Sequence, residues 1–145
     1  MAIYLQVRAG PLGILLDALR VHEVVVPEGL RQDQSFAPWR DQVLRVIRLA
    51  EHLQLPGAEG QHAVVYAPSE GATPAMLMVD EVVRLRQLEA SHWQPMPTVP
   101  VRTAALFDAV CLDDAAGLQL FRLRSELAPE LLGVVEDALS APAPS

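Results

Sequence analysis

Short apolar runs that end at turn residues are the feature that most restricts how this chain can fold. The 145 residues include 12 prolines and 8 glycines, spread along most of the sequence. Because proline and glycine interrupt helices and central strands, long elements are excluded from most of the chain. Many short strands at near-regular spacing, joined by hairpin turns, are typical of small β-barrels. We therefore expect an all-β fold with short helices.

The N-terminal third is expected to supply two or three strands. The run "AIYLQVRA" (2–9) alternates between apolar and polar residues, which predicts a half-buried strand. After the turn signal Gly10–Pro11, the run 12–26 predicts one or two further strands that stop at Pro27. An amphipathic helix over 15–25 is the alternative, although the β-branched residues 24–26 favour a strand at its end.

The same pattern continues to residue 123. A hairpin is expected in 35–49, with Asp41 taking the left-handed backbone of the turn Arg40–Asp41–Gln42. Pro38 cannot donate a ladder hydrogen bond, so its strand should lie at a sheet edge or begin there. The remaining expected elements are a short helix from Leu49 stopped by Pro56–Gly57, strands in 62–67 and 75–88, an irregular segment in 94–100, and a closing hairpin in 103–123 that turns at 113–117.

One corner of the predicted fold occurs twice in the sequence. "VIRLAEHL" (46–53) superposes on "LFRLRSEL" (120–127), with Arg48 over Arg122 and Leu49 over Leu123. In both copies a strand-like run passes through an Arg-Leu pair into one turn of helix. We expect each copy to end a hairpin and to cap one end of a small barrel.

Charge and composition exclude several classes of function. The formal net charge of −7 disfavours nucleic acid or an anionic membrane surface as a partner, because both require a basic face. Hydrophobic residues make up 51% of the chain, which is typical of a globular protein, and the single cysteine, Cys111, is expected to be a small buried side chain. No signal peptide or membrane-spanning run is apparent, so we expect a cytosolic protein.

Three segments in order resemble the CheW-like domain of bacterial chemotaxis adaptors. The family's "GVINLRGRVIPVIDL" lies over "SFAPWRDQVLRVIRL" (35–49) without a gap, which places Arg40 on the motif arginine. The family's "LLVDEV" matches "MLMVDEV" (76–82), with Asp80 and Glu81 on the acidic pair, and its final "LLDL" resembles "QLFRL" (119–123). The resemblance runs from about residue 3 to 127.

The departures from the family pattern are substantial. Asp41 replaces a glycine, Pro38 replaces an asparagine, and arginine replaces both "D-L" aspartates, at Arg48 and Arg122. The family's "VREI"-like strand aligns in two ways. Without a gap, its valine and glutamate fall on Leu19 and Val21, which we slightly prefer; with two inserted residues they fall on Val21 and Glu23. The chain thus resembles a divergent member of the family.

The resemblance implies a fold and a set of partners. It implies two small SH3-like barrels that share a hydrophobic interface, and a scaffold that bridges the regulatory domain of a CheA-type histidine kinase and the cytoplasmic tip of a chemoreceptor. The candidate protein-binding residues are Trp39, Arg40, Leu19, Val21, Glu23, Asp80 and Glu81. Arg40 is either a solvated turn residue or a forked donor for a partner's carboxylate. Trp39 is either a contact anchor or a cover for the barrel end.

No pattern in the sequence indicates catalysis. The four histidines are scattered, and none is spaced as a metal-ligand pair. Asp80 and Glu81, as neighbours on one strand, would point to opposite faces and could not act on one substrate. We therefore expect no enzyme activity, no metal and no cofactor. The alternatives are a CheW-like module that dimerises or binds another cytosolic protein instead of a receptor, and a small barrel enzyme or ligand carrier.

The expected domain division is simple. Residues 1–128 form the CheW-like domain, residues 129–140 an amphipathic helix with Leu131, Val135 and Leu139 on one face, and residues 141–145 a disordered tail. The helix is expected to pack on the barrels, with docking to another protein as the alternative.

Overall fold

Strands dominate the computed structural model, which describes residues 2–31, 34–55, 60–67, 71, 73–113 and 118–124. The elements in chain order are β1 (Ala2–Ala9), β2 (Leu12–Asp17), η1 (Ala18–Arg20), β3 (Val21–Val25), β4 (Phe36–Trp39), β5 (Gln42–Arg48), α1 (Leu49–His52), β6 (His62–Tyr66), β7 (Ala75–Val79), β8 (Glu81–Leu88), η2 (Ala90–His92), α2 (Val101–Leu106), β9 (Phe107–Asp113) and β10 (Leu118–Leu123). The all-β class with short helices is therefore confirmed. The predicted helix 129–140 and tail 141–145 lie outside the described residues.

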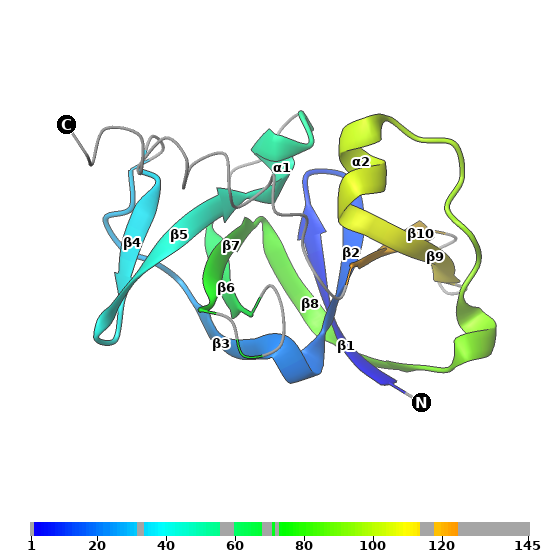
Figure 1. Cartoon of the computed structure of the whole chain (residues 1–145), viewed down its shortest axis with the longest axis horizontal. Helices are drawn as coiled ribbons and strands as arrows, with labels where there is room; N and C mark the ends of the chain where they lie inside the picture. Colours follow the sequence, from blue (N-terminus) through cyan, green and yellow to red (C-terminus); the bar gives the residue numbers. More distant parts are fainter. Residues whose placement is uncertain are drawn as a thin grey trace.

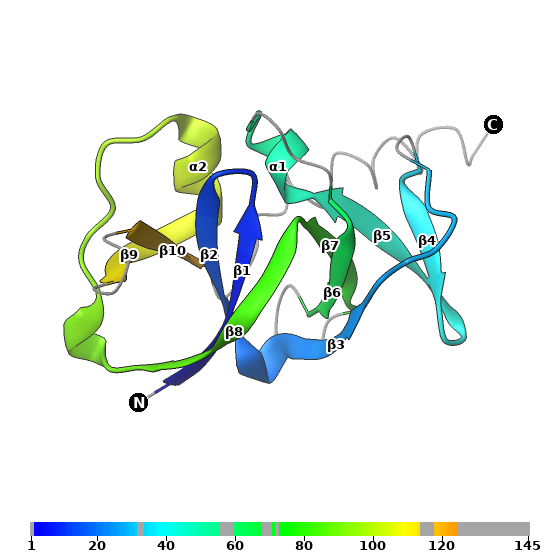
Figure 2. The same cartoon turned by 180° about the vertical axis from the view of Figure 1, so that it is seen from behind.

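The strands form two five-stranded sheets that lie side by side (Figures 1 and 2). Sheet 1 has the order β8-β1-β2-β10-β9, and sheet 2 has the order β3-β6-β7-β5-β4. In each sheet the pairs are antiparallel except one, which is β10 with β2 in sheet 1 and β5 with β7 in sheet 2. The two sheets thus follow the same pattern of pairing, as expected for a pair of related barrels.

The repeated corner occupies equivalent places in the two sheets. Val46, Ile47 and Arg48 of β5 pair with Met76, Leu77 and Met78 of β7, and Leu120, Phe121 and Arg122 of β10 pair with Gly13, Ile14 and Leu15 of β2. The eight-residue echo in the sequence therefore marks the strand that makes the parallel pair in each sheet.

Both faces of the central strands are buried, which explains the nearly continuous apolar runs. The largest core cluster takes residues from both sheets, including Val7 and Ile14 of sheet 1 and Val64 and Leu77 of sheet 2, and so fills the space between the barrels. A second cluster fills the inner face of sheet 2, and a third lies on the opposite face of sheet 1. The prediction of two barrels that share a hydrophobic interface is confirmed.

The predicted strand 75–88 is wrong in one respect, because it is two strands in different sheets. β7 ends at Val79 in sheet 2, and β8 begins at Glu81 in sheet 1. Asp80 between them donates its backbone N–H to the carbonyl of Arg8. The chain crosses between the barrels at Asp80.

Three other boundaries differ from the sequence-based expectation. The first residues of the expected closing hairpin belong to the helix Val101–Leu106, with Pro100 as its N-cap, and the strand begins only at Phe107. α1 ends at His52, ahead of Gln54 with φ +57°, so the helix stops before Pro56. In the hairpin turn the left-handed residue is Arg40, with φ +53°, rather than Asp41. The helical alternative for 15–25 is excluded by β2 and β3.

Tyr66 gives this core a measurable dependence on pH. Its hydroxyl is buried and has no hydrogen-bond partner among the described residues, and burial raises its pKa to about 12 from an ordinary value of 10. In the unfolded chain Tyr66 ionises near pH 10, whereas in the folded chain it stays neutral until about pH 12. Stability should therefore be complete below pH 10 and fall by about 2 kcal/mol as the pH rises to 12.

The Tyr66→Phe variant tests this dependence. Denaturant titrations from pH 8 to 12 should show a shallower loss of stability than in the wild type above pH 10. Below pH 10 the variant should be at least as stable, since it removes an unpaired buried hydroxyl. Equal slopes for the two proteins above pH 10 would contradict the assignment.

Candidate protein-binding surface

Three of the predicted binding residues meet at one end of sheet 2. Trp39, the last residue of β4, is 9% exposed and belongs to the core cluster inside sheet 2. Its indole Nε1 donates to the Glu23 carboxylate at 3.0 Å. Trp39 thus covers the barrel end, as one of the two interpretations predicted, and its polar edge is held by a strand from the other side of the barrel.

Arg40 lies directly over this tryptophan. Its guanidinium carbon is 4.4 Å from the centre of the Trp39 ring, and Nη2 is 3.3 Å from the same Glu23 oxygen that the indole binds. The Arg40 side chain is 65% exposed. At such exposure the ion pair and the cation–π contact each contribute on the order of 1 kcal/mol or less. They orient the guanidinium more than they stabilise the fold.

Glu23 reaches this position because of an irregularity in β3. The pairing with β6 shifts between Val21, opposite Tyr66, and Glu23, opposite Val65. The extra residue, His22, has its ring 6.1 Å from Trp39. The shift turns Val21 toward the core between the barrels and Glu23 toward Trp39. Glu23, rather than Val21, is therefore the residue of β3 that reaches Trp39.

Leu19 and Val21 are not equivalent. Leu19 is 94% exposed on η1, where its backbone N–H is capped by the Asp17 carboxylate at 3.0 Å. Val21 is partly buried against the cluster between the barrels. Leu19 is thus a projecting apolar side chain, whereas Val21 is mostly part of the core.

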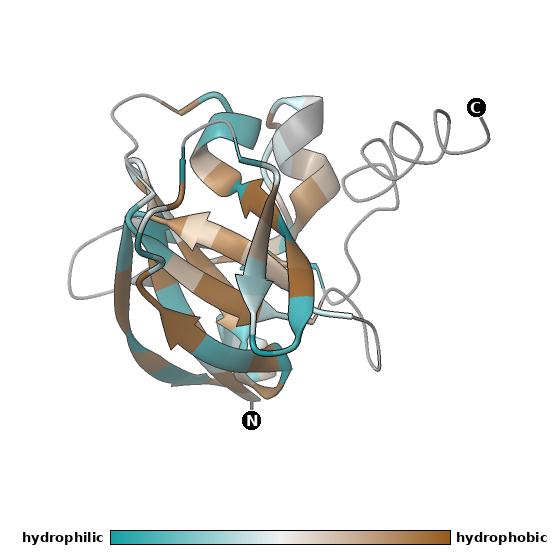
Figure 3. Cartoon of the chain, turned by 90° about the vertical axis from the view of Figure 1, so that its left-hand side faces the viewer, coloured by the Kyte–Doolittle hydropathy of each residue, from teal (hydrophilic) through white to brown (hydrophobic). Residues whose placement is uncertain are grey.

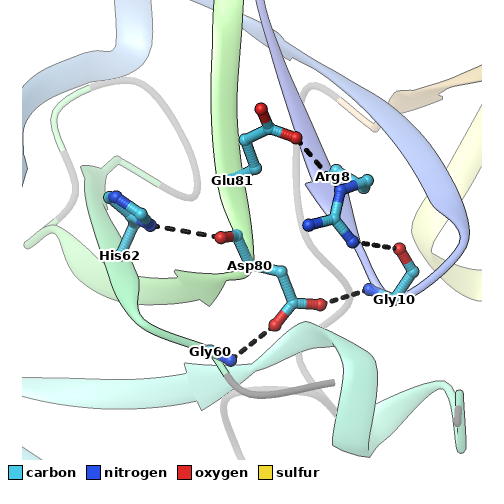
Figure 4. A network of polar contacts seen from close by, with 6 residues as sticks. All are labelled: Arg8, Gly10, Gly60, His62, Asp80 and Glu81. Carbon is cyan, nitrogen blue, oxygen red and sulfur yellow. Dashed lines mark hydrogen bonds and ion pairs between the residues drawn. The ribbon is translucent and has the colours of Figure 1, made fainter. Parts of the chain in front are cut away.

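Asp80 and Glu81 lie at the crossover between the barrels, in contact with a different set of groups (Figure 4). The Asp80 carboxylate accepts hydrogen bonds from the backbone N–H groups of Gly10 and Gly60, and its carbonyl is 3.2 Å from His62 Nδ1. Glu81 pairs with Arg8 at 3.1 Å, with both side chains about half exposed. These contacts do not include Arg40. Asp80 braces the fold, and a partner contact for either residue stays a prediction.

The arginines that replace the family's aspartates also have internal roles. Arg48 donates to the carbonyls of Gln34, at 2.8 Å, and Arg31, at 2.6 Å, and so holds the segment that leads into β4. Arg122 pairs with Asp108 at 2.7 Å and lies 4.5 Å from the centre of the Trp93 ring. Trp93 packs on Tyr4 and thereby covers the cluster of sheet 1.

Sequence reasoning missed several exposed apolar side chains. Val43 of β5, Leu85 of β8 and Val26 after β3 are each more than half exposed. Leu85 lies between Arg84 and Arg86, so alternation would predict that it faces the core rather than solvent. No local feature of the sequence shows which of the two faces of a strand is covered by the other barrel.

Comparison with known proteins assigns the family. A family model described as the CheW-like domain matches residues 3–125, which is most of the chain. This chain belongs to the CheW-like domain family. The family is one of non-catalytic chemotaxis scaffold proteins. No curated protein matches the sequence.

A solved structure supports the fold assignment. The scaffolding protein TtCheW from Thermoanaerobacter tengcongensis superposes with a TM-score of 0.71 at 18% identity, covering 90% of this chain and 91% of that one. At this identity the likeness concerns the CheW fold alone. Among the described residues, no helix is long and apolar enough to cross a bilayer, and no group of three or more His, Cys, Asp and Glu side chains could hold a metal ion.

Proposed function

We propose that this CheW-like chain is a non-catalytic adaptor that bridges a CheA-type histidine kinase and the cytoplasmic tip of a chemoreceptor. The observation that carries the proposal is the oriented guanidinium of Arg40, held on Trp39 by Glu23 at the exposed tip of a hairpin. An adaptor acts by holding two partners on one rigid body, which raises the effective concentration of each for the other.

Arg40 is suited to receive a carboxylate from a partner. A guanidinium carries five N–H donors, and the contact with Glu23 uses one edge of the group. Since Trp39 and Glu23 already restrict the side chain, Arg40 would lose less conformational entropy when it binds a partner's carboxylate. Glu23 also competes for the charge of Arg40, so it would tune the strength of the contact.

The apolar part of the contact would come from neighbouring residues of η1 and β3. Leu19 is almost fully exposed, and Val24 is 42% exposed on β3. A helix from a partner, with apolar side chains spaced by three and four residues, could cover such side chains while its acidic residues reach Arg40.

Binding measurements on the purified chain test the proposal. The chain would be titrated separately with the regulatory domain of the kinase and with a receptor-tip fragment from the same genome. Arg40→Ala should weaken binding to at least one partner about tenfold, the loss expected for one charge-assisted contact. Arg40→Lys, which keeps the charge and loses the fork, should recover only part of that loss.

The matched control is Arg84→Ala, which removes an exposed arginine of β8 in the other sheet. It should change either affinity by less than twofold. Absence of any complex with the kinase domain at micromolar protein would overturn the proposal. Binding to the kinase domain alone would favour the alternative of a module without a receptor contact.

A further inference from the structure

The outer face of the β4–β5 hairpin carries exposed apolar side chains in the part of the chain that the structure describes. We define this hairpin face by two cross-strand pairs, Pro38 opposite Val43 and Phe36 opposite Arg45. Val43 is 68% exposed and Pro38 is exposed, while the guanidinium of Arg45 lies 5.9 Å from the centre of the Phe36 ring. The hairpin projects away from sheet 1 in Figure 1, and Figure 3 views the molecule from this side.

The hairpin face continues the face on which the barrels meet. Residues of a strand alternate between faces, so Val43, Arg45 and Ile47 of β5 point to the same side. Ile47 is buried in the cluster between the barrels, whereas Val43 lies beyond the reach of sheet 1. An apolar face that is covered at one end and open at the other is suited to a further covering element.

The charge of the hairpin differs from that of the chain. Residues 36–48 contain three arginines, Arg40, Arg45 and Arg48, and one acid, Asp41, which gives +2 in a chain of net charge −7. A covering element that is acidic as well as apolar would therefore match this face.

Such an element follows β10 in the same chain. Residues 129–139, "PELLGVVEDAL", contain three acids, Glu130, Glu136 and Asp137, and no basic residue. If helical, the segment places Leu131, Val135 and Leu139 on one stripe, with Glu136 beside the stripe and Glu130 and Asp137 on the opposite face. An isolated helix of this length is marginal in water, and Gly133 weakens it by about 1 kcal/mol. Its stripe needs a surface to pack on.

We propose that residues 129–139 dock as an amphipathic helix on the hairpin face of the same molecule. The apolar stripe covers Phe36, Pro38 and Val43, and Glu136 at its edge approaches Arg45. This docking does not use Arg40 or the other residues of the partner contacts proposed above, and it does not depend on them. It assigns a role to the C-terminal segment and explains why the hairpin is basic.

Hydrogen exchange of the full-length chain, followed by mass spectrometry, tests the docking. Residues 129–139 should exchange at least tenfold more slowly in the protein than in a synthetic peptide of residues 126–141. Val43→Asp should return them to the peptide rate, as should Val135→Asp on the segment itself. The charge reversal Arg45→Glu should reduce the protection, and adding Glu136→Arg should restore part of it.

Leu85→Asp is the matched control, because Leu85 is exposed to a similar extent, 64%, on the other sheet. It should leave the protection unchanged. Exchange at the peptide rate in the wild type, or equal loss in Leu85→Asp and Val43→Asp, would overturn the proposal. Protection that rises with protein concentration between 1 and 100 μM would also overturn it, since the segment would then dock on a second copy.

Discussion

Replacing Asp80 by alanine is expected to lower the free energy of unfolding by about 3 kcal/mol. The Asp80 carboxylate accepts the backbone N–H groups of Gly10, in the β1–β2 turn, and Gly60, ahead of β6. Alanine would leave both donors in a partly buried site without this acceptor, at about 1–3 kcal/mol each. Since the two donors belong to different barrels, their loss should also loosen the crossover. Urea titration followed by circular dichroism measures the effect.

Two neighbouring variants separate this brace from a general effect of charge. Asp80→Asn keeps the shape but leaves one amide oxygen as acceptor and presents an NH₂ group to the second donor. It should lose about half as much stability as Asp80→Ala. Glu81→Gln removes the half-exposed pair with Arg8 and should cost less than about 1 kcal/mol. If Asp80→Ala and Glu81→Gln proved equally mild, Asp80 would not brace the barrels.

The strands themselves could be predicted because their information is local. Alternation identified β1, and turn residues placed the ends of β2 to β5 within a few positions. The β7–β8 break could not be predicted, because 75–88 is apolar or alternating throughout and Asp80 resembles one more outward residue. The chain leaves sheet 2 where Asp80 contacts Gly10, Arg8 and Gly60, all of which lie far from it in the sequence.

Trp39, Arg40 and Glu23 are candidate binding residues from the sequence, but the sequence does not predict that they contact one another. Arg40 and Trp39 follow from the hairpin, since a turn tip is exposed. Glu23, rather than Val21, joins them because the pairing of β3 with β6 is shifted between these two residues. No local feature of the sequence indicates this shift. Asp80 and Glu81 were grouped with Arg40 by motif alone, whereas the structure places them at the crossover.

The second large effect is expected in the core between the barrels. Leu77 is fully buried in β7, between Ile47 of β5 and Val64 of β6, in the cluster that takes residues from both sheets. Leu77→Ala should cost about 3 kcal/mol, as the sum of lost burial and the cavity left behind. The exposed Leu85→Ala should change stability by less than about 0.5 kcal/mol.

The same variant shows whether the barrels unfold together. The chain has two tryptophans, and each reports on one barrel: Trp39 lies in the cluster of sheet 2, and Trp93 packs on Tyr4 against the cluster of sheet 1. In the backgrounds Trp93→Phe and Trp39→Phe, fluorescence therefore follows the two barrels separately. Because the largest cluster belongs to both sheets, Leu77→Ala should lower the urea midpoint by the same amount for both probes. A shift seen by Trp39 alone would mean that sheet 1 folds without sheet 2, and that the surface between the barrels is an interface rather than a shared core.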